Sequence, residues 1–249
     1  MTAVARKTSG VVMVLAAGKG LRMRPLTRHR PKPLVEVMGR TLIDRALDRV
    51  VASSIRRAVV NLHYRGGMLQ RHLAKRDDIA IDFSDESLAL LETGGGVAKA
   101  LKRLRDERGR AKPFFVANAD ALWFDRTANA FERLAQAWDG RRMDALLLLQ
   151  PKAKAIGYER DGDYRRAADG RLTRNAGAPA PYVFTGIQIL HPRLFEGAPR
   201  GAFSSVRLFD AAEARGRLFG LRHDGAWMDV GTPAGVDLAA QKLVELGKS

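Results

Sequence analysis

The chain has 249 residues, of which 46% are hydrophobic, and this is enough for one sizeable α/β core. It contains no cysteine, so disulfides and thiolate metal sites are excluded, and we expect a cytoplasmic protein. No apolar run approaches the roughly 20 residues of a membrane span, so no membrane partner is expected. The formal net charge of +16 is compatible with nucleic acid, an anionic surface or a phosphorylated small substrate, or with arginines spread over a solvated surface.

The first 150 residues alternate apolar strands with amphipathic helices. Residues 1–10 are expected to form a flexible tail. Residues 11–17 are a continuous apolar run closed by glycine, which is typical of a central parallel strand, and residues 41–51 have the apolar spacing of a helix. Further strands are expected at 58–62, 79–83, 113–117 and 145–149, and further helices at 68–73, 94–104 and 127–138. This alternation predicts a doubly wound, mainly parallel sheet.

After Gln150 the pattern changes. Residues 157–175 have the composition of short polar strands, with a turn at Asp169 and Gly170. The remaining expected elements are a strand at 182–190, a helix at 205–215, a strand at 218–222 and a helix at 233–246. Since no repeat, linker or sharp boundary interrupts the chain, we predict a single domain.

The strongest motif is a glycine-rich segment, residues 15–27, that directly follows the first strand. Glycines at such a position let the backbone approach a polyphosphate and direct successive N–H groups at it. Two familiar phosphate-binding motifs do not fit. A dinucleotide fingerprint needs glycine where Met23 stands, and a P-loop needs Gly-Lys-Ser/Thr five residues beyond Gly18.

Positive charge is concentrated in the same region. The segment from Lys19 to Lys32 contains four arginines and one histidine, and it contains no acidic residue. Arg22 can form a bidentate fork with phosphate oxygens. Lys32 lies between two prolines, which restrict the backbone and present its ammonium with less loss of conformational entropy.

Residues 15–27 and 31–34 resemble the opening of the sugar-1-phosphate nucleotidyltransferase family, whose pattern is roughly L-A-[AG]-G-x-G-x-R-[LM]-x-P-L-T followed by P-K-P. The resemblance implies a Rossmann-like three-layer αβα sandwich with a mixed, mainly parallel sheet, of the nucleotide-diphospho-sugar transferase type. It also implies magnesium-dependent transfer of a nucleotidyl group from a nucleoside triphosphate to a sugar 1-phosphate, with release of pyrophosphate. Leu21 departs from the Thr or Glu that is common at its position.

The resemblance continues at three later segments. Residues 91–96 are similar to the family's base- and sugar-facing loop. Residues 118–120 match a segment whose aspartate binds magnesium, although Ala119 replaces the usual glycine, and residues 227–232 resemble W-x-D-x-G-T, whose aspartate is the second metal ligand. The resemblance therefore implies magnesium as the cofactor, with Asp120 and Asp229 as its ligands.

The same resemblance assigns roles to individual residues. Arg22, Lys32 and Asp120 are implied to be catalytic. The implied nucleotide-binding residues are Ala16, Ala17, Gly18, Lys19, Gly20, Glu86, Thr93 and Gly94, and the implied sugar-binding residues are Glu92, Asp163, Asn175, Thr185 and Gly186. For Glu86, reading of the base edge and an ordinary solvated loop acid remain equally open. The nucleotide-binding half would span about residues 11–150 and the sugar-binding half about 151–249.

Within the family, residues 91–96, 162–164 and 184–192 resemble the uridylyltransferases of N-acetylmuramate 1-phosphate that serve cell-wall recycling. The expected partners are therefore UTP and a sugar 1-phosphate, in a monomer or small homo-oligomer. A mannose-1-phosphate guanylyltransferase is the alternative, although the Glu-Lys pair usual in those enzymes is missing around residues 173–175. A basic nucleic-acid-binding protein is the alternative from another class; it would leave Asp120 and Asp229 unexplained, so no nucleic acid is expected.

Overall fold

The computed structural model of the protein describes residues 3–175 and 177–247. Within these residues, nine strands form one main sheet, in which the order β11-β10-β12-β6-β1-β4-β5 is extended by β8 beside β12 and by β13 beside β8. The strands of this sheet are β1 (Val11–Leu15), β4 (Arg57–Leu62), β5 (Ala80–Asp85), β6 (Phe114–Asn118), β8 (Ala145–Pro151), β10 (Tyr164–Arg166), β11 (Leu172–Arg174), β12 (Tyr182–Leu190) and β13 (Leu218–Arg222).

The direction of the strands divides the sheet into two parallel groups. Strand β1 runs parallel to both β4 and β6, and β13 runs parallel to β8. Strand β12 lies between the two groups and is antiparallel to both β6 and β8. The register of β12 against β8 shifts between Phe184 and Gln188. On its other edge, β12 pairs with β10 before this shift and with β6 after it.

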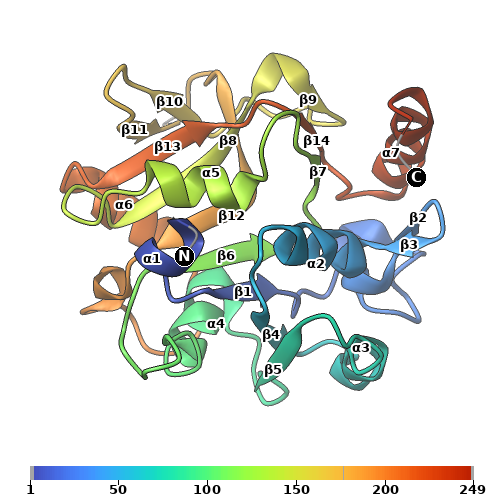
Figure 1. Ribbon diagram of the computed structural model, residues 1–249. Helices are drawn as coiled ribbons and strands as arrows, with labels where there is room; N and C mark the ends of the chain where they lie inside the picture. The colour runs from blue at the N-terminus through green and yellow to red at the C-terminus, as the bar shows by residue number, and fades with distance from the viewer. Residues whose placement is uncertain (1–2, 176, 248–249) are drawn as a thin grey trace.

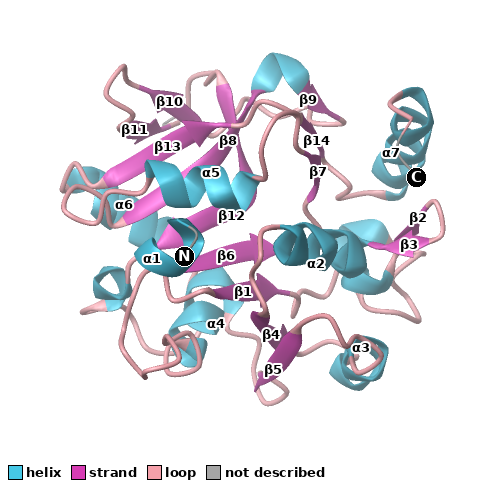
Figure 2. Ribbon diagram, viewed as in Figure 1, coloured by secondary structure: helices cyan, strands magenta, loops and turns pink. Residues whose placement is uncertain are grey.

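Helices cover both faces of the sheet (Figure 1). Figure 1 shows α1, α2 and α5 in front of the sheet and α4 and α6 behind it. Figure 2 shows the strands crossing the molecule between these two layers. The helices are α1 (Ala3–Lys7), α2 (Leu42–Ala52), α3 (Gly66–Leu73), α4 (Glu92–Ala100), α5 (Ala130–Ala137), α6 (Val206–Ala214) and α7 (Pro233–Glu245). The two faces hold separate apolar cores, so the architecture is a three-layer sandwich.

Two small sheets lie beside the main one. Strands β7 (Leu122–Phe124), β14 (Ala226–Met228) and β9 (Ala155–Ile156) form the first of them, and β2 (Glu36–Val37) pairs with β3 (Arg40–Thr41) in the second. A third apolar cluster packs these strands against α7. The pairing of β14 with β7 thus brings residues 226–228, from late in the chain, next to residues 122–124.

The structure confirms the mixed, mainly parallel α/β sheet and the expected elements, with shifts of a few residues at their ends. The expected tail requires a correction, because residues 3–7 form α1; Met1 and Thr2 lie outside the described residues. Val4 is buried against the core of the front face, and Lys7 donates to two carbonyls around the end of α5. The sequence pattern does not predict β2, β3, β7, β9 or β14, which have only two or three residues each.

Among the described residues, no helix is both long and apolar enough to cross a membrane.

Candidate active site

The glycine-rich loop lies where the order of the parallel strands reverses. From β1 the chain continues outward to β4 and β5, and it then returns to place β6 on the other side of β1. Leu15, at the end of β1, pairs with Asn118, at the end of β6, so residues 16–20 and Asp120 emerge side by side. Ligands of open α/β sheets bind at such a switch point, outside the carboxyl ends of the strands.

Gly20 brings Lys32 against the loop. Its φ of +61° is a left-handed conformation that favours glycine, and an added Cβ would lie only 2.9 Å from the Cβ of Lys32. The hydroxyl of Thr27 donates to the Gly20 carbonyl at 2.7 Å and fixes the return of the chain. The ammonium of Lys32 then forms an ion pair with the carboxylate of Asp120. Three predicted site residues therefore meet at the end of β6.

Gly231 allows the side chains of Arg22 and Asp229 to come close to each other. An added Cβ at Gly231 would lie only 2.9 Å from Oδ1 of Asp229, and it would contact Nη2 of Arg22 at 3.5 Å, so glycine leaves the carboxylate its space beside the guanidinium. The Gly231 N–H also donates to Asp229 Oδ1 at 3.0 Å. The second carboxylate therefore lies close to the exposed guanidinium of Arg22, which follows the glycine-rich loop.

The two carboxylates are chemically suited to magnesium. No group of three or more His, Cys, Asp or Glu side chains in the described part of the chain could hold a metal by itself. Magnesium is usually held by one or two carboxylates, with substrate phosphates and waters as the other ligands. Each carboxylate here lies against a cationic side chain, Lys32 at Asp120 and Arg160 at Asp229, the latter at 3.5 Å. This donor set fits a cation that arrives with a triphosphate.

A cavity of about 220 Å³ opens beside the loop. Its wall contains Ala17, Gly18, Glu92, Thr93 and Asp120 from the predicted site, together with Leu15, Asn61, Leu90 and Asn118. Its position at the switch point makes it the candidate site for the nucleoside.

Asn61 connects two parts of the wall of this cavity, and no motif in the sequence predicts this role. The side chain is buried at the end of β4, where Oδ1 accepts from the Ala16 N–H at 2.7 Å and Nδ2 donates to Glu86 Oε1 at 2.7 Å. The second carboxylate oxygen of Glu86 accepts from the Leu91 N–H at 2.9 Å. A single asparagine after a buried strand carries little signal by itself, so only the fold could reveal this connection.

The structure contradicts the reading of Glu86 as a solvated loop acid, because its side chain is 1% exposed. Each of its carboxylate oxygens accepts a hydrogen bond from within the protein, and its role towards the base stays a prediction. Gly94 is a packing residue, because an added Cβ would overlap the ring of Phe203. Both residues hold the loop that leads into α4.

Three of the predicted sugar-binding side chains are engaged within the protein. Asp163 accepts from the hydroxyl of Tyr158 at 3.3 Å and from the Phe184 N–H at 2.8 Å. Thr185 is buried and donates to the Leu148 carbonyl, and the amide of Asn175 donates to the Gly162 carbonyl at 3.0 Å. These side chains shape the region between β8 and β12.

Glu92 lines the candidate nucleoside cavity, and Gly186 lies behind a residue of its wall. Glu92 lines the cavity and has a φ of +59°, which is unusual for a residue with a side chain. Gly186 has a φ of +85°, and an added Cβ would lie 2.7 Å from the side-chain nitrogen of Asn118, which also lines the cavity. Glycine at position 186 therefore lets β12 bend next to the carboxyl end of β6.

Tyr158 forms a platform near Asp229 that is fixed by its neighbours, and no motif in the sequence predicts it. Its ring packs edge-on against Trp227, whose indole N–H donates to the Thr185 carbonyl at 3.1 Å. Burial, together with the neighbouring Asp163, raises the pKa of Tyr158 to about 12, so its hydroxyl stays protonated and donates to Asp163. The guanidinium of Arg160 lies 4.6 Å from the ring centre.

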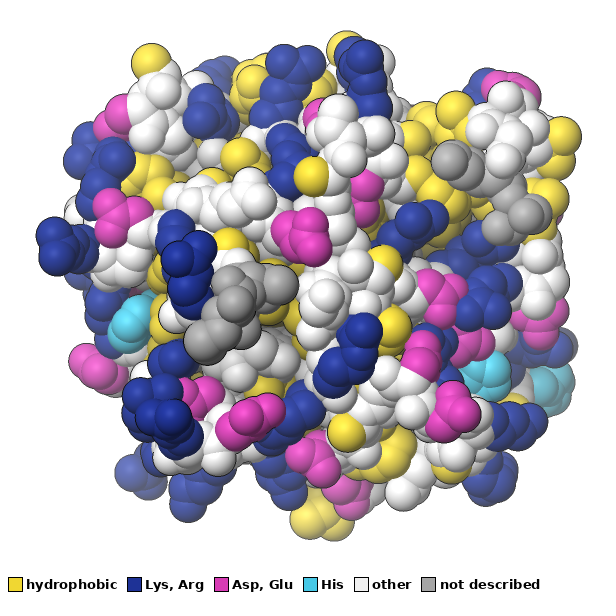
Figure 3. All heavy atoms as spheres, viewed as in Figure 1, with side chains coloured by type: hydrophobic (Ala, Val, Ile, Leu, Met, Phe, Trp, Pro, Cys, Tyr) yellow, Lys and Arg dark blue, Asp and Glu magenta, His cyan; other side chains and the backbone are white. Residues whose placement is uncertain are grey.

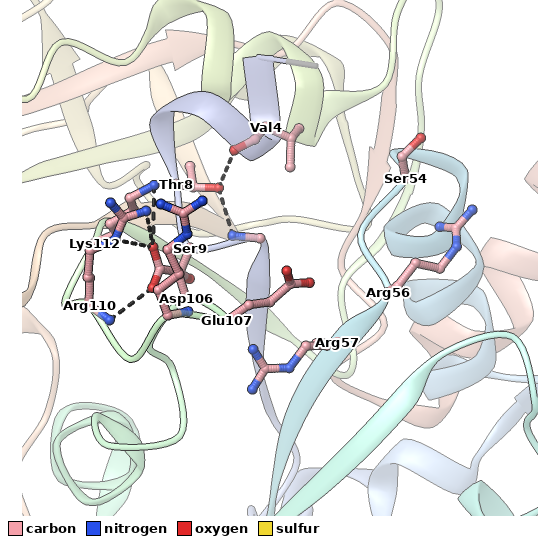
Figure 4. A pocket seen from close by; sticks show the side chains of 12 residues that line it. Val4, Thr8, Ser9, Ser54, Arg56, Arg57, Asp106, Glu107, Arg110 and Lys112 are labelled. Atoms are coloured by element: carbon pink, nitrogen blue, oxygen red, sulfur yellow. Dashed lines mark hydrogen bonds and ion pairs between the residues drawn. The ribbon is translucent and has the colours of Figure 1, made fainter. Parts of the chain in front are cut away.

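A larger cavity, of about 500 Å³, lies at the opposite edge of the sheet, where β1 and β4 begin (Figure 4). Figure 4 shows Asp106 close to Arg110 and Lys112, and it forms an ion pair with each of them. Since the predicted motifs lie at the carboxyl ends of the strands, this cavity is separate from the candidate active site.

Comparison with known proteins agrees with the geometry. The sequence model of the nucleotidyl transferase family matches residues 11–159. The chain is 42% identical over 240 residues to the N-acetylmuramate alpha-1-phosphate uridylyltransferase of Caulobacter vibrioides, covering 94% of this chain and 97% of the relative. It is 26% identical over 231 residues to the catalytic subunit beta of mannose-1-phosphate guanylyltransferase from Dictyostelium discoideum, covering 89% of this chain and 61% of that one.

The fold has close counterparts among solved structures. The crystal structure of HddC from Yersinia pseudotuberculosis superposes with a TM-score of 0.73 at 21% identity, covering 94% of this chain and 99% of that one. The match of the family model and the likeness along nearly the whole chain lead to one conclusion: the chain belongs to the nucleotidyl transferase family.

Proposed function

We propose that the protein transfers the uridylyl group of UTP to N-acetylmuramate 1-phosphate and releases pyrophosphate and UDP-N-acetylmuramate. The observation that carries the reaction class is the convergence of Arg22, Lys32, Asp120 and Asp229 around one glycine-rich loop at the switch point. The uridylyltransferase of Caulobacter vibrioides, 42% identical, supports the choice of substrates over the guanylyltransferase alternative, at 26%.

The chemistry that these residues would supply is positioning and charge. A phosphate monoester has its second pKa near 6, so a sugar 1-phosphate is mostly dianionic at neutral pH and can attack the α-phosphorus without a general base. The bond between the α-phosphorus and the bridging oxygen breaks as the new bond forms, and pyrophosphate carries away the electron pair. Arg22 would stabilise the departing pyrophosphate, and Lys32 would offset the repulsion between the two anions.

Asp120 and Asp229 would hold the magnesium ion. When bound, the ion supplies Lewis-acid stabilisation of the charge on the phosphates. Lys32 would position the carboxylate of Asp120, and the Gly231 N–H would position that of Asp229. Asn61 would keep the loop in place through the Ala16 N–H.

The test is a pyrophosphate-release assay with a panel of nucleoside triphosphates and sugar 1-phosphates, with and without a chelator. We expect UTP with N-acetylmuramate 1-phosphate to give the highest kcat/KM, and we expect the chelator to abolish release. Asp120→Ala and Asp229→Ala should each lower kcat by at least about a hundredfold while the circular dichroism spectrum is retained. A preference for GTP with mannose 1-phosphate would favour the alternative, and full activity of both variants would exclude this metal site.

A further inference from the structure

Arg160 is a cation on the sugar side of the candidate site. Its guanidinium lies over the ring of Tyr158 and 3.5 Å from Oδ2 of Asp229. The side chain is 64% exposed, so it is free to move, whereas its platform is fixed by Trp227 and Asp163. The guanidinium of Arg160 is therefore placed to bind an anionic group of a substrate that comes close to Asp229 from solvent.

The ion pair with Asp229 does not compete strongly with such a group. A partly exposed pair of this length is worth about 1 kcal/mol or less. A divalent cation at Asp229 would also offset the negative charge that attracts the guanidinium. With the metal and nucleotide in place, the guanidinium of Arg160 would thus be left without its carboxylate partner.

The proposed sugar substrate carries a matching anion. N-acetylmuramate differs from N-acetylglucosamine by a lactyl ether at C3, whose carboxylate is ionised at neutral pH. An arginine can bind such a carboxylate in a bidentate manner. The contact of Arg160 with the ring face of Tyr158 limits the conformational entropy that the side chain loses on binding. On the basis of the proposed function, we infer that Arg160 recognises the lactyl carboxylate and selects N-acetylmuramate 1-phosphate over neutral sugar phosphates.

The other cations of this region serve as comparisons. Lys152 and Arg222 line a cavity of about 660 Å³ that shares Tyr158, but neither forms an ion pair with a carboxylate of the candidate site in the described structure. Arg174 is already held by Asp210 through two hydrogen bonds of 2.6 and 3.1 Å. Arg222 is exposed and unpaired with any described carboxylate, so Arg222→Gln is a matched control for Arg160→Gln.

The experiment measures kcat/KM for N-acetylmuramate 1-phosphate and for N-acetylglucosamine 1-phosphate, at saturating UTP and magnesium. Arg160→Gln should lower the ratio of the two values at least tenfold relative to the wild type. Arg160→Lys should give an intermediate ratio, because it retains the charge but not the fork. Arg222→Gln should keep the ratio within about threefold.

Binding of the two products gives a readout without turnover. By calorimetry, Arg160→Gln should lose most of the wild-type difference in affinity between UDP-N-acetylmuramate and UDP-N-acetylglucosamine. An equal loss for both sugars in Arg160→Gln would overturn the inference, since it would make Arg160 a general support for Asp229. A larger change of the ratio in Arg222→Gln would overturn it too, and would place the carboxylate in the neighbouring cavity.

The substrate preference of the wild-type enzyme distinguishes failure of the proposed function from failure of the role of Arg160. If the wild-type enzyme prefers a neutral sugar 1-phosphate, the proposed function and the inference both fail. If it prefers N-acetylmuramate 1-phosphate and Arg160→Gln retains that preference, only the role of Arg160 fails.

Discussion

At the scale of single residues, the active site depends on glycines that leave room for charged side chains. Gly20 admits Lys32, and Gly231 admits Arg22 and Asp229, so the charges meet although they lie up to about 200 residues apart in the sequence. Such a glycine has no chemical role itself, and its importance is visible only when the neighbour that fills the space is known.

The clustering of arginines around the loop allows a direct comparison of two of them. Arg22→Ala should lower kcat by about a hundredfold or more, because a clamp on transition-state charge is worth several kcal/mol. Arg28→Ala should change kcat by less than about threefold, because the Arg28 side chain is exposed and has no hydrogen bond to a described residue. Steady-state kinetics with UTP would check both. Equal and small losses would show that the positive segment is only a solvated surface.

At the scale of elements, α4 is held by the contacts of its three glycines. The N–H groups of Gly94 and Gly95 both donate to the Phe203 carbonyl, and an added Cβ at Gly95 would overlap the carbonyl oxygen of Gly201. An added Cβ at Gly96 would lie 2.8 Å from Oε1 of Glu86. The glycine run that resembles a ligand-binding loop therefore serves chiefly to bring α4 close to residues 201–203.

A pair of substitutions can distinguish a glycine that packs against the protein, Gly95, from a glycine that faces open space, Gly18. Gly95→Ala should lower the free energy of unfolding by about 2 kcal/mol or more, because a backbone atom must move, and the gain in helix propensity of about 1 kcal/mol does not offset this. Gly18→Ala should leave stability within about 1 kcal/mol, because nothing lies within 4 Å of its added Cβ and its φ is not left-handed.

Ligand binding should show the opposite order for the same pair. The open space over Gly18 faces the candidate nucleoside cavity, so the added methyl group should weaken UTP binding at least tenfold. Urea denaturation and calorimetric titration would measure the two effects. Unchanged UTP affinity in Gly18→Ala would contradict close approach of the backbone to the nucleotide.

At the scale of the whole molecule, the sequence predicted the alternating α/β frame because its buried strands and amphipathic helices have strong periodic patterns. It did not predict the small sheet of β7, β14 and β9, since strands of two or three residues have no periodicity and depend on partners far along the chain. The sequence singles out Asp120 and Asp229 by their motifs, whereas Asn61, Tyr158 and Arg160 belong to no motif and are brought to the candidate site only by tertiary contacts. Figure 3 shows the excess positive charge spread over the visible face and mixed with acidic side chains.

The global stability contains one pH-dependent contribution that can be isolated. Burial raises the pKa of Asp125 to about 6, and its Oδ1 lies 4.0 Å from Nδ1 of His223, with no hydrogen bond at either atom within the described residues. Burial also lowers the pKa of His223, so no cation forms there at neutral pH. The other charged groups acting on Asp125 are Arg49 and Arg133, which lower its pKa, and Asp224, which raises it.

Between about pH 4 and pH 6 the folded protein holds a proton on Asp125 that the unfolded chain has lost, so this group makes stability fall as the pH rises. Asp125→Asn should therefore be more stable than the wild type at pH 8, by at most about 3 kcal/mol, and the difference should shrink towards pH 4. Thermal unfolding of both proteins across this range would measure it. A difference that is constant with pH would show that the carboxyl group is not buried in its neutral form.

The place of β14 in the chain has a consequence for biosynthesis. A ribosome releases the glycine-rich loop, Lys32 and Asp120 first, but β7 gains its antiparallel neighbour only when residues 226–228 emerge, and Asp229 follows directly after them. A nascent chain that ends before this point would hold one of the two carboxylates and would expose the edge of β7. Partial products of translation that lack residues 226–229 should therefore be inactive.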